Sequence, residues 1–296
     1  MQIIDAQIHD VGPWYDWTAA DAETQHRVLT ELVIAYLDAV GVQGVILFPG
    51  GEADSAAWAA ESLPDRFSYV PPITPDTPDI EGAVRRAKHS QRKGLLGLRA
   101  IIGWPLDGSE VRRFEAGAWN PIFAACEKHQ VPLFTFVTRL LPRAADIAKR
   151  YPGLTLVVDH LGLRQPPMDE PENPPLKSLH ELLDLAKYPN VHVKLCGLPS
   201  LSREPYPYRD VTSGLRAIVD AFGPGRLMWG SDTTRFAGRI GIVRFQNPRT
   251  LEQYQGKHTY AEALHFIRDS DVLTPSEKEA ILGGTIRRVL GWPKSA

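Results

Sequence analysis

Short runs of β-forming residues alternate with longer segments of helical periodicity along the whole chain, and this alternation limits the fold more than any other feature. Several of the runs are uninterrupted and apolar, such as Gly44–Phe48 and Leu154–Val158, which is typical of strands covered on both faces of a parallel sheet. Eight strands are predicted: Ile3–Ile8, Gly44–Phe48, Phe67–Ile73, Leu95–Ile102, Val131–Val137, Leu154–Asp159, Val191–Cys196 and Arg226–Trp229.

Amphipathic helices are predicted between these strands. Apolar side chains from Leu29 to Val40 recur at intervals of three and four residues, which indicates a helix that ends near Gly41. Further helical segments are Ala118–Gln130, Arg143–Arg150 and Pro207–Phe222. Eight strands with helices between them, over 296 residues, favour an α/β fold of the closed (β/α)₈ TIM-barrel type over a doubly wound sheet. We expect a single domain over residues 1–296.

Three segments that follow predicted strands are longer than a barrel loop needs. They are the Pro-rich, acidic Leu163–Leu176, then Leu198–Val211, and finally Thr233–Thr259. Loops after strands lie at the C-terminal face of a barrel, which is where barrel enzymes keep their active sites.

Charge and cysteine content exclude several classes of protein. Lys and Arg number 33 and Asp and Glu number 35, so the net charge is −2, which disfavours binding of nucleic acid or an anionic membrane. Cys126 and Cys196 are the two cysteines, too few for a disulfide framework or a multi-cysteine zinc site. With no signal-like segment and no apolar run near ~20 residues, we expect a cytoplasmic protein that acts on a small molecule. Homo-oligomer formation stays open.

Polar side chains occur at the C-terminal ends of three predicted strands. Gln7 and His9 lie two residues apart on the first strand, so they share a face. His160 directly follows the sixth strand, and Asp232 comes shortly after the eighth. Because these strand ends meet at the mouth of a barrel, the four side chains are predicted to form one site that transfers protons or binds metal.

Five motifs carry a resemblance to a known family. They are IIDAQIH, VVDHLG, VKLCGL, MWGSD and ILGGTIRRVLGW. In order and spacing they resemble the amidohydrolase superfamily, in the branch that includes 2-pyrone-4,6-dicarboxylate lactonase, sugar lactonases and 4-sulfomuconolactone hydrolase. The resemblance extends from Ile3 to Trp292. It implies a TIM-barrel hydrolase of a lactone or cyclic ester, with a carboxylated small molecule as the expected substrate in catabolism.

The resemblance also implies roles for individual residues. His9 matches the second His of the first-strand pair, and His160 matches the sixth-strand His. Asp232 matches the eighth-strand Asp, which is the general base of the family and in some members a metal ligand. Gln7 stands where the family has the first His of the pair. Since Phe134–Val137 offers no His or Lys at the end of the fifth strand, a bridged two-metal centre is not expected.

Two versions of the chemistry stay open. In one, His9, His160 and Asp232 hold one divalent metal, Zn²⁺ or Mn²⁺. In the other, Gln7, His9 and His160 donate hydrogen bonds to the substrate carbonyl without metal. The resemblance supports both, because both kinds of lactonase occur in this branch. In either version Asp232 takes a proton from the attacking water.

Further residues are candidates for binding substrate. Arg99, on the fourth strand, could hold a carboxylate with its guanidinium fork, or could belong to a buried ion pair. Lys194, on the seventh strand, is expected to be functional or paired if it faces inward. Arg235, Tyr206 and Tyr208 follow the last two strands and could close the pocket, or could be ordinary loop and packing residues.

Two other functions remain as alternatives. A metal-dependent non-oxidative decarboxylase of a hydroxylated aromatic acid is favoured by a non-His residue at Gln7 and disfavoured by the missing fifth-strand His. A barrel that binds a small carboxylate without turnover is suggested by the loss of the first His, although two histidines and Asp232 remain together.

Overall fold

All eight predicted strands are present in the structure. The structure is a computed structural model that describes residues 1–9, 21–49, 53–105, 107–164, 172–232 and 258–292. Its strands are β1 (Ile4–Ile8), β2 (Gly44–Leu47), β3 (Phe67–Tyr69), β4 (Leu98–Ile101), β5 (Leu133–Phe136), β6 (Leu156–Val158), β7 (Val191–Lys194) and β8 (Leu227–Met228).

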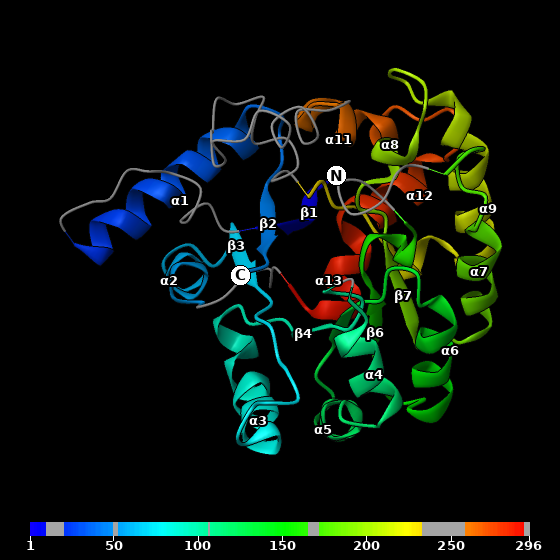
Figure 1. The fold of residues 1–296 in the computed structure, drawn as a ribbon. Coiled ribbons are helices and arrows are strands. Elements are labelled where there is room, and N and C mark those ends of the chain that lie inside the picture. Colours follow the sequence, from blue (N-terminus) through cyan, green and yellow to red (C-terminus); the bar gives the residue numbers. More distant parts are fainter. Residues whose placement is uncertain (10–20, 50–52, 106, 165–171, 233–257, 293–296) are drawn as a thin grey trace.

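Helices surround the strands on the outside (Figure 1). In the described residues they are α1 (Ala22–Asp38), α2 (Asp54–Ser62), α3 (Ile80–Ser90), α4 (Ser109–Glu115), α5 (Asn120–His129), α6 (Leu141–Arg150), α7 (Leu179–Leu183), α8 (Leu198–Leu201), α9 (Thr212–Phe222), α11 (Tyr260–Arg268), α12 (Pro275–Glu279) and α13 (Thr285–Leu290). The four predicted helices correspond to α1, α5, α6 and α9. Within this part of the chain, no helix is both long and apolar enough to cross a bilayer.

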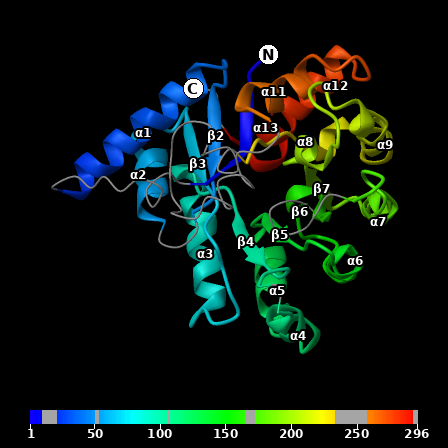
Figure 2. The same cartoon turned by 45° about the horizontal axis from the view of Figure 1, so that its top comes forward.

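The strands form a closed parallel barrel in sequence order. Strands β1, β2 and β3 are hydrogen-bonded in that order in one sheet. Strands β4, β5, β6, β7 and β8 are hydrogen-bonded in that order in a second. A parallel bridge between Tyr69 and Leu95 joins β3 to the chain that leads into β4. The N–H of Ala6 donates to the carbonyl of Trp229 at 2.9 Å, which joins β1 to the end of β8. Figure 2 shows the helices arranged around these strands. The TIM barrel expected from the sequence is therefore confirmed.

Apolar side chains fill the barrel interior and close its N-terminal end. The interior set is Ile4, Ala6, Ile46, Phe48, Val70, Leu96, Phe134, Val157 and Met228. Ile286, Leu290 and Trp292, from α13 and the residues after it, pack against this set, and the Trp292 indole donates to the carbonyl of Pro64 at 2.9 Å. Because this end is plugged by hydrophobic residues, the polar chemistry is confined to the C-terminal ends of the strands.

His192, on β7, should make the fold sensitive to acid. Burial lowers the pKa of His192 to about 4 from its ordinary value of 6.5, so the folded state holds the neutral ring. The unfolded chain takes up its proton near 6.5, and the free energy of unfolding should therefore fall by up to about 3 kcal/mol from this site as the pH drops from about 6.5 to about 4. The free energy of unfolding, measured with urea, should differ between about pH 7 and about pH 4. His192→Leu should remove the part of this difference that comes from His192. An unchanged difference would contradict the assignment.

Candidate active site

A shift in strand register brings Gln7 and His9 to the inside of the barrel. The pairing of β1 with β2 changes register between Asp5 and Ile8. Ala6 packs in the barrel interior. The next side chain, Gln7, is fully buried and also faces the interior, where it contacts His160 after β6. Strict alternation would have placed Ala6 and Gln7 on opposite faces. The bulge therefore turns the end of β1 towards the site.

His160 and Asp232 lie at the ends of β6 and β8 in unusual backbone conformations. His160 has φ of 52° and Asp232 has φ of 53°, a region that residues other than glycine seldom adopt. The N–H of Asp232 donates to the backbone carbonyl of Gln7 at 2.9 Å. Such conformations persist only where the surrounding structure enforces them, so both side chains are placed by the barrel rather than by free loops.

The side chains of these four residues meet in one cluster. Gln7 Nε2 lies 3.1 Å from His160 Nε2, 3.4 Å from His9 Nε2 and 3.5 Å from Asp232 Oδ1. His9 Nε2 lies 3.5 Å from Asp232 Oδ1, and His160 Nδ1 lies 3.8 Å from Asp232 Oδ2. Strands β1, β6 and β8 thus bring together the residues that the sequence singled out as catalytic.

His9 presents an unprotonated nitrogen to the cluster. Its Nδ1 lies 2.8 Å from the backbone carbonyl oxygen of Phe48, and because a carbonyl only accepts hydrogen bonds, Nδ1 carries the hydrogen. Burial, with the positive charges of Arg99 and Lys194, lowers the pKa of His9 to about 4 against the attraction of Asp232. The ring is therefore neutral at pH 7, and its Nε2 faces Asp232 as an acceptor.

The Gln7 amide is held from behind by a buried ammonium group. Lys194 Nζ donates to Gln7 Oε1, and the Lys194 side chain has no exposed surface. Because the amide oxygen faces Lys194, the NH₂ group faces His9, His160 and Asp232. An amide whose oxygen accepts a charged hydrogen bond is also a stronger donor at nitrogen.

Lys194 and Arg99 share one carboxylate in the barrel interior. Asp159 Oδ1 lies 2.7 Å from Lys194 Nζ, and Asp159 Oδ2 accepts from Arg99 Nε at 2.7 Å. Burial alone would raise the pKa of Asp159, but the two cations and His160 outweigh it and lower it to about 2. The Lys194 ammonium also lies 3.7 Å from the centre of the Phe48 ring, a cation–π contact that offsets part of its desolvation.

A second carboxylate ties the ends of β1 and β8 together. Asp5 accepts from the N–H of Gln7 and the N–H of Ser231, both at 2.9 Å, and from the Ser231 hydroxyl at 2.5 Å. Burial raises the pKa of Asp5 to about 6, although these hydrogen bonds oppose the shift. Asp5 therefore holds the backbone at Gln7 and at Ser231, the residue before Asp232, in fixed positions.

The substrate-binding candidates have different surroundings in the structure. Arg99 is 7% exposed and is part of the ion pair with Asp159, yet no described residue accepts a hydrogen bond from its two terminal nitrogens. A guanidinium fork therefore remains for a ligand. Lys194 is different, because its fully buried ammonium is engaged by Asp159 and Gln7. Lys194 is thus paired, which is one of the two outcomes expected for an inward-facing lysine, and its ammonium has no exposed surface for contact with a substrate.

Of the two loop tyrosines, Tyr208 is a packing residue, whereas Tyr206 is exposed. Tyr208 has no exposed surface and packs edge-on against Phe266, His258 and Tyr206, so it belongs to the hydrophobic core and not to a cap over the site. Tyr206 is 40% exposed. Arg235 lies outside the described residues.

Asp159 and Asp5 hold the site together, although neither is among the site residues predicted from the sequence. Asp159 follows an apolar strand and precedes His160, and Asp5 lies within β1, all of whose residues are buried. A carboxylate in a run that is otherwise buried needs a partner, and Lys194, inside β7, is the matching cation. That complementarity is visible in the sequence, whereas the contact itself requires knowledge of which strands are neighbours.

The cluster does not fit a divalent metal as it is arranged. Among the described residues, no group of three or more His, Cys, Asp and Glu side chains is arranged to hold one. The Gln7 NH₂ group points at the Nε2 atoms of His9 and His160, so the lone pairs that would bind metal already accept hydrogen bonds. An amide N–H group is itself no metal ligand, and the nearby Lys194 adds positive charge.

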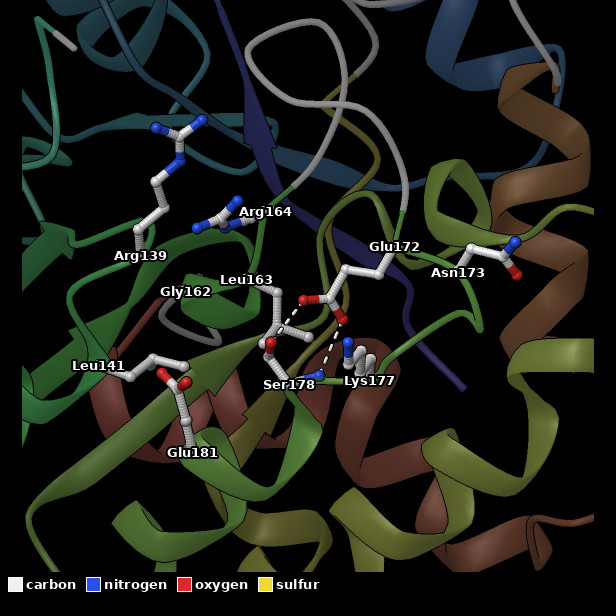
Figure 3. Close-up of a pocket in the computed structure, with 10 residues that line it drawn as sticks. All are labelled: Arg139, Leu141, Gly162, Leu163, Arg164, Glu172, Asn173, Lys177, Ser178 and Glu181. Atoms are coloured by element: carbon white, nitrogen blue, oxygen red, sulfur yellow. Dashed lines mark hydrogen bonds between the residues drawn. The ribbon is translucent and has the colours of Figure 1, made fainter.

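A charged pocket of about 420 Å³ lies at the same end of the barrel, between α6 and α7 (Figure 3). Arg139, Arg164 and Lys177 contribute positive charge to its lining. Of its two carboxylates, Glu172 is already bound by the Ser178 N–H at 2.8 Å and by the Ser178 hydroxyl; the other is Glu181. Positive charge therefore prevails in this pocket.

The amino-acid sequence matches a known protein family and two characterised relatives. The family model described as amidohydrolase matches residues 4–292. An L-fucono-1,5-lactonase of Burkholderia ambifaria is 38% identical over 134 residues, which are 41% of this chain and 42% of that protein. The match thus spans less than half of that relative. A 4-sulfomuconolactone hydrolase of Hydrogenophaga intermedia is 27% identical over 256 residues, 83% of this chain and 79% of that protein.

Among solved structures, an amidohydrolase of Burkholderia multivorans with bound zinc superimposes with a TM-score of 0.70. The superposition covers 99% of this chain and 100% of that chain, at 21% identity. The likeness shows that the two chains share the barrel fold.

Proposed function

The chain belongs to the amidohydrolase family, and from this membership we propose that it hydrolyses a lactone or cyclic ester that carries an anionic group. The observation that carries the proposal is the cluster of Gln7, His9, His160 and Asp232, in which a carboxylate lies 3.5 Å from a neutral imidazole and beside an oriented amide donor. Two of the relatives named above are lactone hydrolases, which supports the same reaction here.

Asp232 and His9 would prepare the attacking water. Both present acceptor atoms to the same space, 3.5 Å apart, so one water can donate to both. As the water oxygen attacks the ring carbonyl, its proton moves to Asp232. When the ring C–O bond breaks, the proton returns from Asp232 to the departing alkoxide, and the product is a hydroxy acid. General-base catalysis of this kind typically contributes about 10²–10⁴-fold.

Gln7 and Arg99 would stabilise the oxyanion that forms during attack. The shortest contact of Gln7 Nε2 is with His160, at 3.1 Å, and its contact with His9 is longer, at 3.4 Å. Its second hydrogen, which makes the longer contact, is therefore available to the substrate oxygen. The terminal nitrogens of Arg99 add further donors. Such fixed donors act in place of a Lewis acid, so we propose that the reaction proceeds without metal.

The positive charges near the cluster support an anionic substrate. The Arg99 fork suits a carboxylate bidentately, and the pocket with Arg139, Arg164 and Lys177 offers a second place for an anionic group. The alternatives of a decarboxylase and of a barrel without turnover are not favoured, because neither is suggested by the related proteins and the cluster contains both a base and an acceptor for water.

Incubation with a panel of neutral and carboxylated lactones tests the proposal. We expect a gain of one water in mass for at least one carboxylated member, with a lower KM than for its neutral analogue. Carbon dioxide release from hydroxylated aromatic acids, with all lactones unchanged, would instead support the decarboxylase.

A further inference from the structure

The contact between Lys194 and Gln7 has no counterpart in the proposed reaction steps, yet it lies deep in the barrel interior. Both side chains are fully buried, and they come from β7 and β1, far apart in the sequence. Lys194 is held in turn by Asp159, at 2.7 Å, and by the ring faces of Phe48 and Phe134. Its ammonium therefore has a fixed position from which it contacts Gln7 Oε1.

The orientation of the Gln7 amide decides whether the cluster is a hydrogen-bonded centre or a metal-binding centre. His9 Nε2, His160 Nε2 and Asp232 Oδ1 are three acceptors around Gln7 Nε2, at 3.1–3.5 Å from it. Atoms bound to one tetrahedral zinc at 2.0–2.1 Å lie about 3.3–3.4 Å apart. The distances from Gln7 Nε2 to these three acceptors thus match the spacing of a fourth ligand, but the nitrogen presents hydrogens instead of a lone pair.

A rotated Gln7 amide would instead favour a cation in the cluster. Rotation about the last side-chain bond would place Gln7 Oε1 among three other acceptors, which is unfavourable unless a cation lies between them. It would also turn the NH₂ group towards the Lys194 ammonium, where donor would face donor. The rotated amide is therefore disfavoured at both ends, and Lys194 is the cause at the NH₂ end.

We propose that Lys194 is a positioning residue that locks the Gln7 amide with its NH₂ group towards His9, His160 and Asp232, and thereby keeps metal out of the centre. The inference builds on the proposed function, because it explains how a metal-free centre keeps its donor. It concerns the state of the cluster before substrate binds, so it can be tested without knowledge of the substrate.

Zinc content is the main test. Wild-type protein, Lys194→Met and Lys194→Arg are dialysed against zinc chloride, then against metal-free buffer, and zinc is measured by mass spectrometry. We expect wild type and Lys194→Arg to retain well under one zinc per chain and Lys194→Met to retain about one. The double variant Lys194→Met/Asp232→Asn should lose this zinc, which separates the cluster from surface histidines.

A second measurement reports on the lock directly. Nitrogen-15 NMR of the imidazoles should show both His9 and His160 unprotonated at Nε2 in wild type and in Lys194→Arg. In Lys194→Met, where the amide can turn, at least one of the two should carry its hydrogen on Nε2. A loss of packing alone would not exchange these tautomers.

Gln7→Glu gives an independent test that leaves the Lys194–Asp159 pair intact, should Lys194→Met fail to fold. One carboxylate oxygen would accept from Lys194 and the other would replace the NH₂ group, so we expect a gain of about one zinc per chain. Zinc bound stoichiometrically by wild type, or no gain in any folded variant, would overturn the inference. Absence of lactone hydrolysis would instead count against the proposed function and leave these readouts unaffected.

Discussion

Replacement of Asp232 by Asn is expected to lower kcat for lactone hydrolysis by about 10²–10⁴-fold while the fold is retained. The amide cannot take a proton from water, whereas the backbone N–H of Asp232 that binds the Gln7 carbonyl is unchanged. Steady-state kinetics and circular dichroism of the purified variant measure the two effects separately.

Asp220→Asn is a matched control for this variant, because it makes the same chemical change on α9, where Asp220 is exposed and paired with Arg216. It should have wild-type kcat. If Asp232→Asn retained turnover within a factor of a few, another group would have to be the base.

Asp159→Ala is expected to lower the free energy of unfolding by about 3–5 kcal/mol, because it leaves Lys194 and Arg99 without their shared carboxylate in the barrel interior. Urea unfolding at neutral pH measures the loss. The largest part should come from Lys194, which has no exposed surface.

An exposed ion pair provides the comparison. Asp38 and Arg66 approach to 2.5 Å, but Asp38 is 58% exposed, and exposed pairs contribute little to stability. Asp38→Ala should therefore change the unfolding free energy far less than Asp159→Ala. Equal losses of unfolding free energy in the two variants would show that the buried Asp159 network contributes no more to stability than an exposed ion pair.

The sequence was sufficient to predict the barrel and the meeting of the candidate catalytic residues. The alternation of apolar runs with amphipathic segments depends on local periodicity, which is visible in one chain, and the strand ends of a barrel converge for geometric reasons. Gln7, His9, His160 and Asp232 could thus be placed together without knowing any distance. The prediction that Gln7 and His9 share a face also held, although the bulge within β1 was not foreseen.

Contacts between distant strands could not be predicted in the same way. Lys194 was expected to be functional or paired if it faced inward, but its partners Asp159 and Gln7 could not be named because they lie on other strands. Tyr208 was assigned to a loop that could cap the site, but its side chain lies in the core against Phe266. In each case the residue type was informative, and the missing information was which side chains pack against it.

Activity after metal removal tests the proposed chemistry most directly. Wild-type protein is dialysed against a strong chelator, its residual zinc and manganese are measured, and hydrolysis of the best lactone is compared before and after. We expect undiminished kcat with far less than one metal per chain, because the Gln7 and Arg99 donors take the place of a Lewis acid. Activity that disappears with the metal, and returns when about one zinc per chain is restored, would contradict this mechanism and make His9, His160 and Asp232 metal ligands.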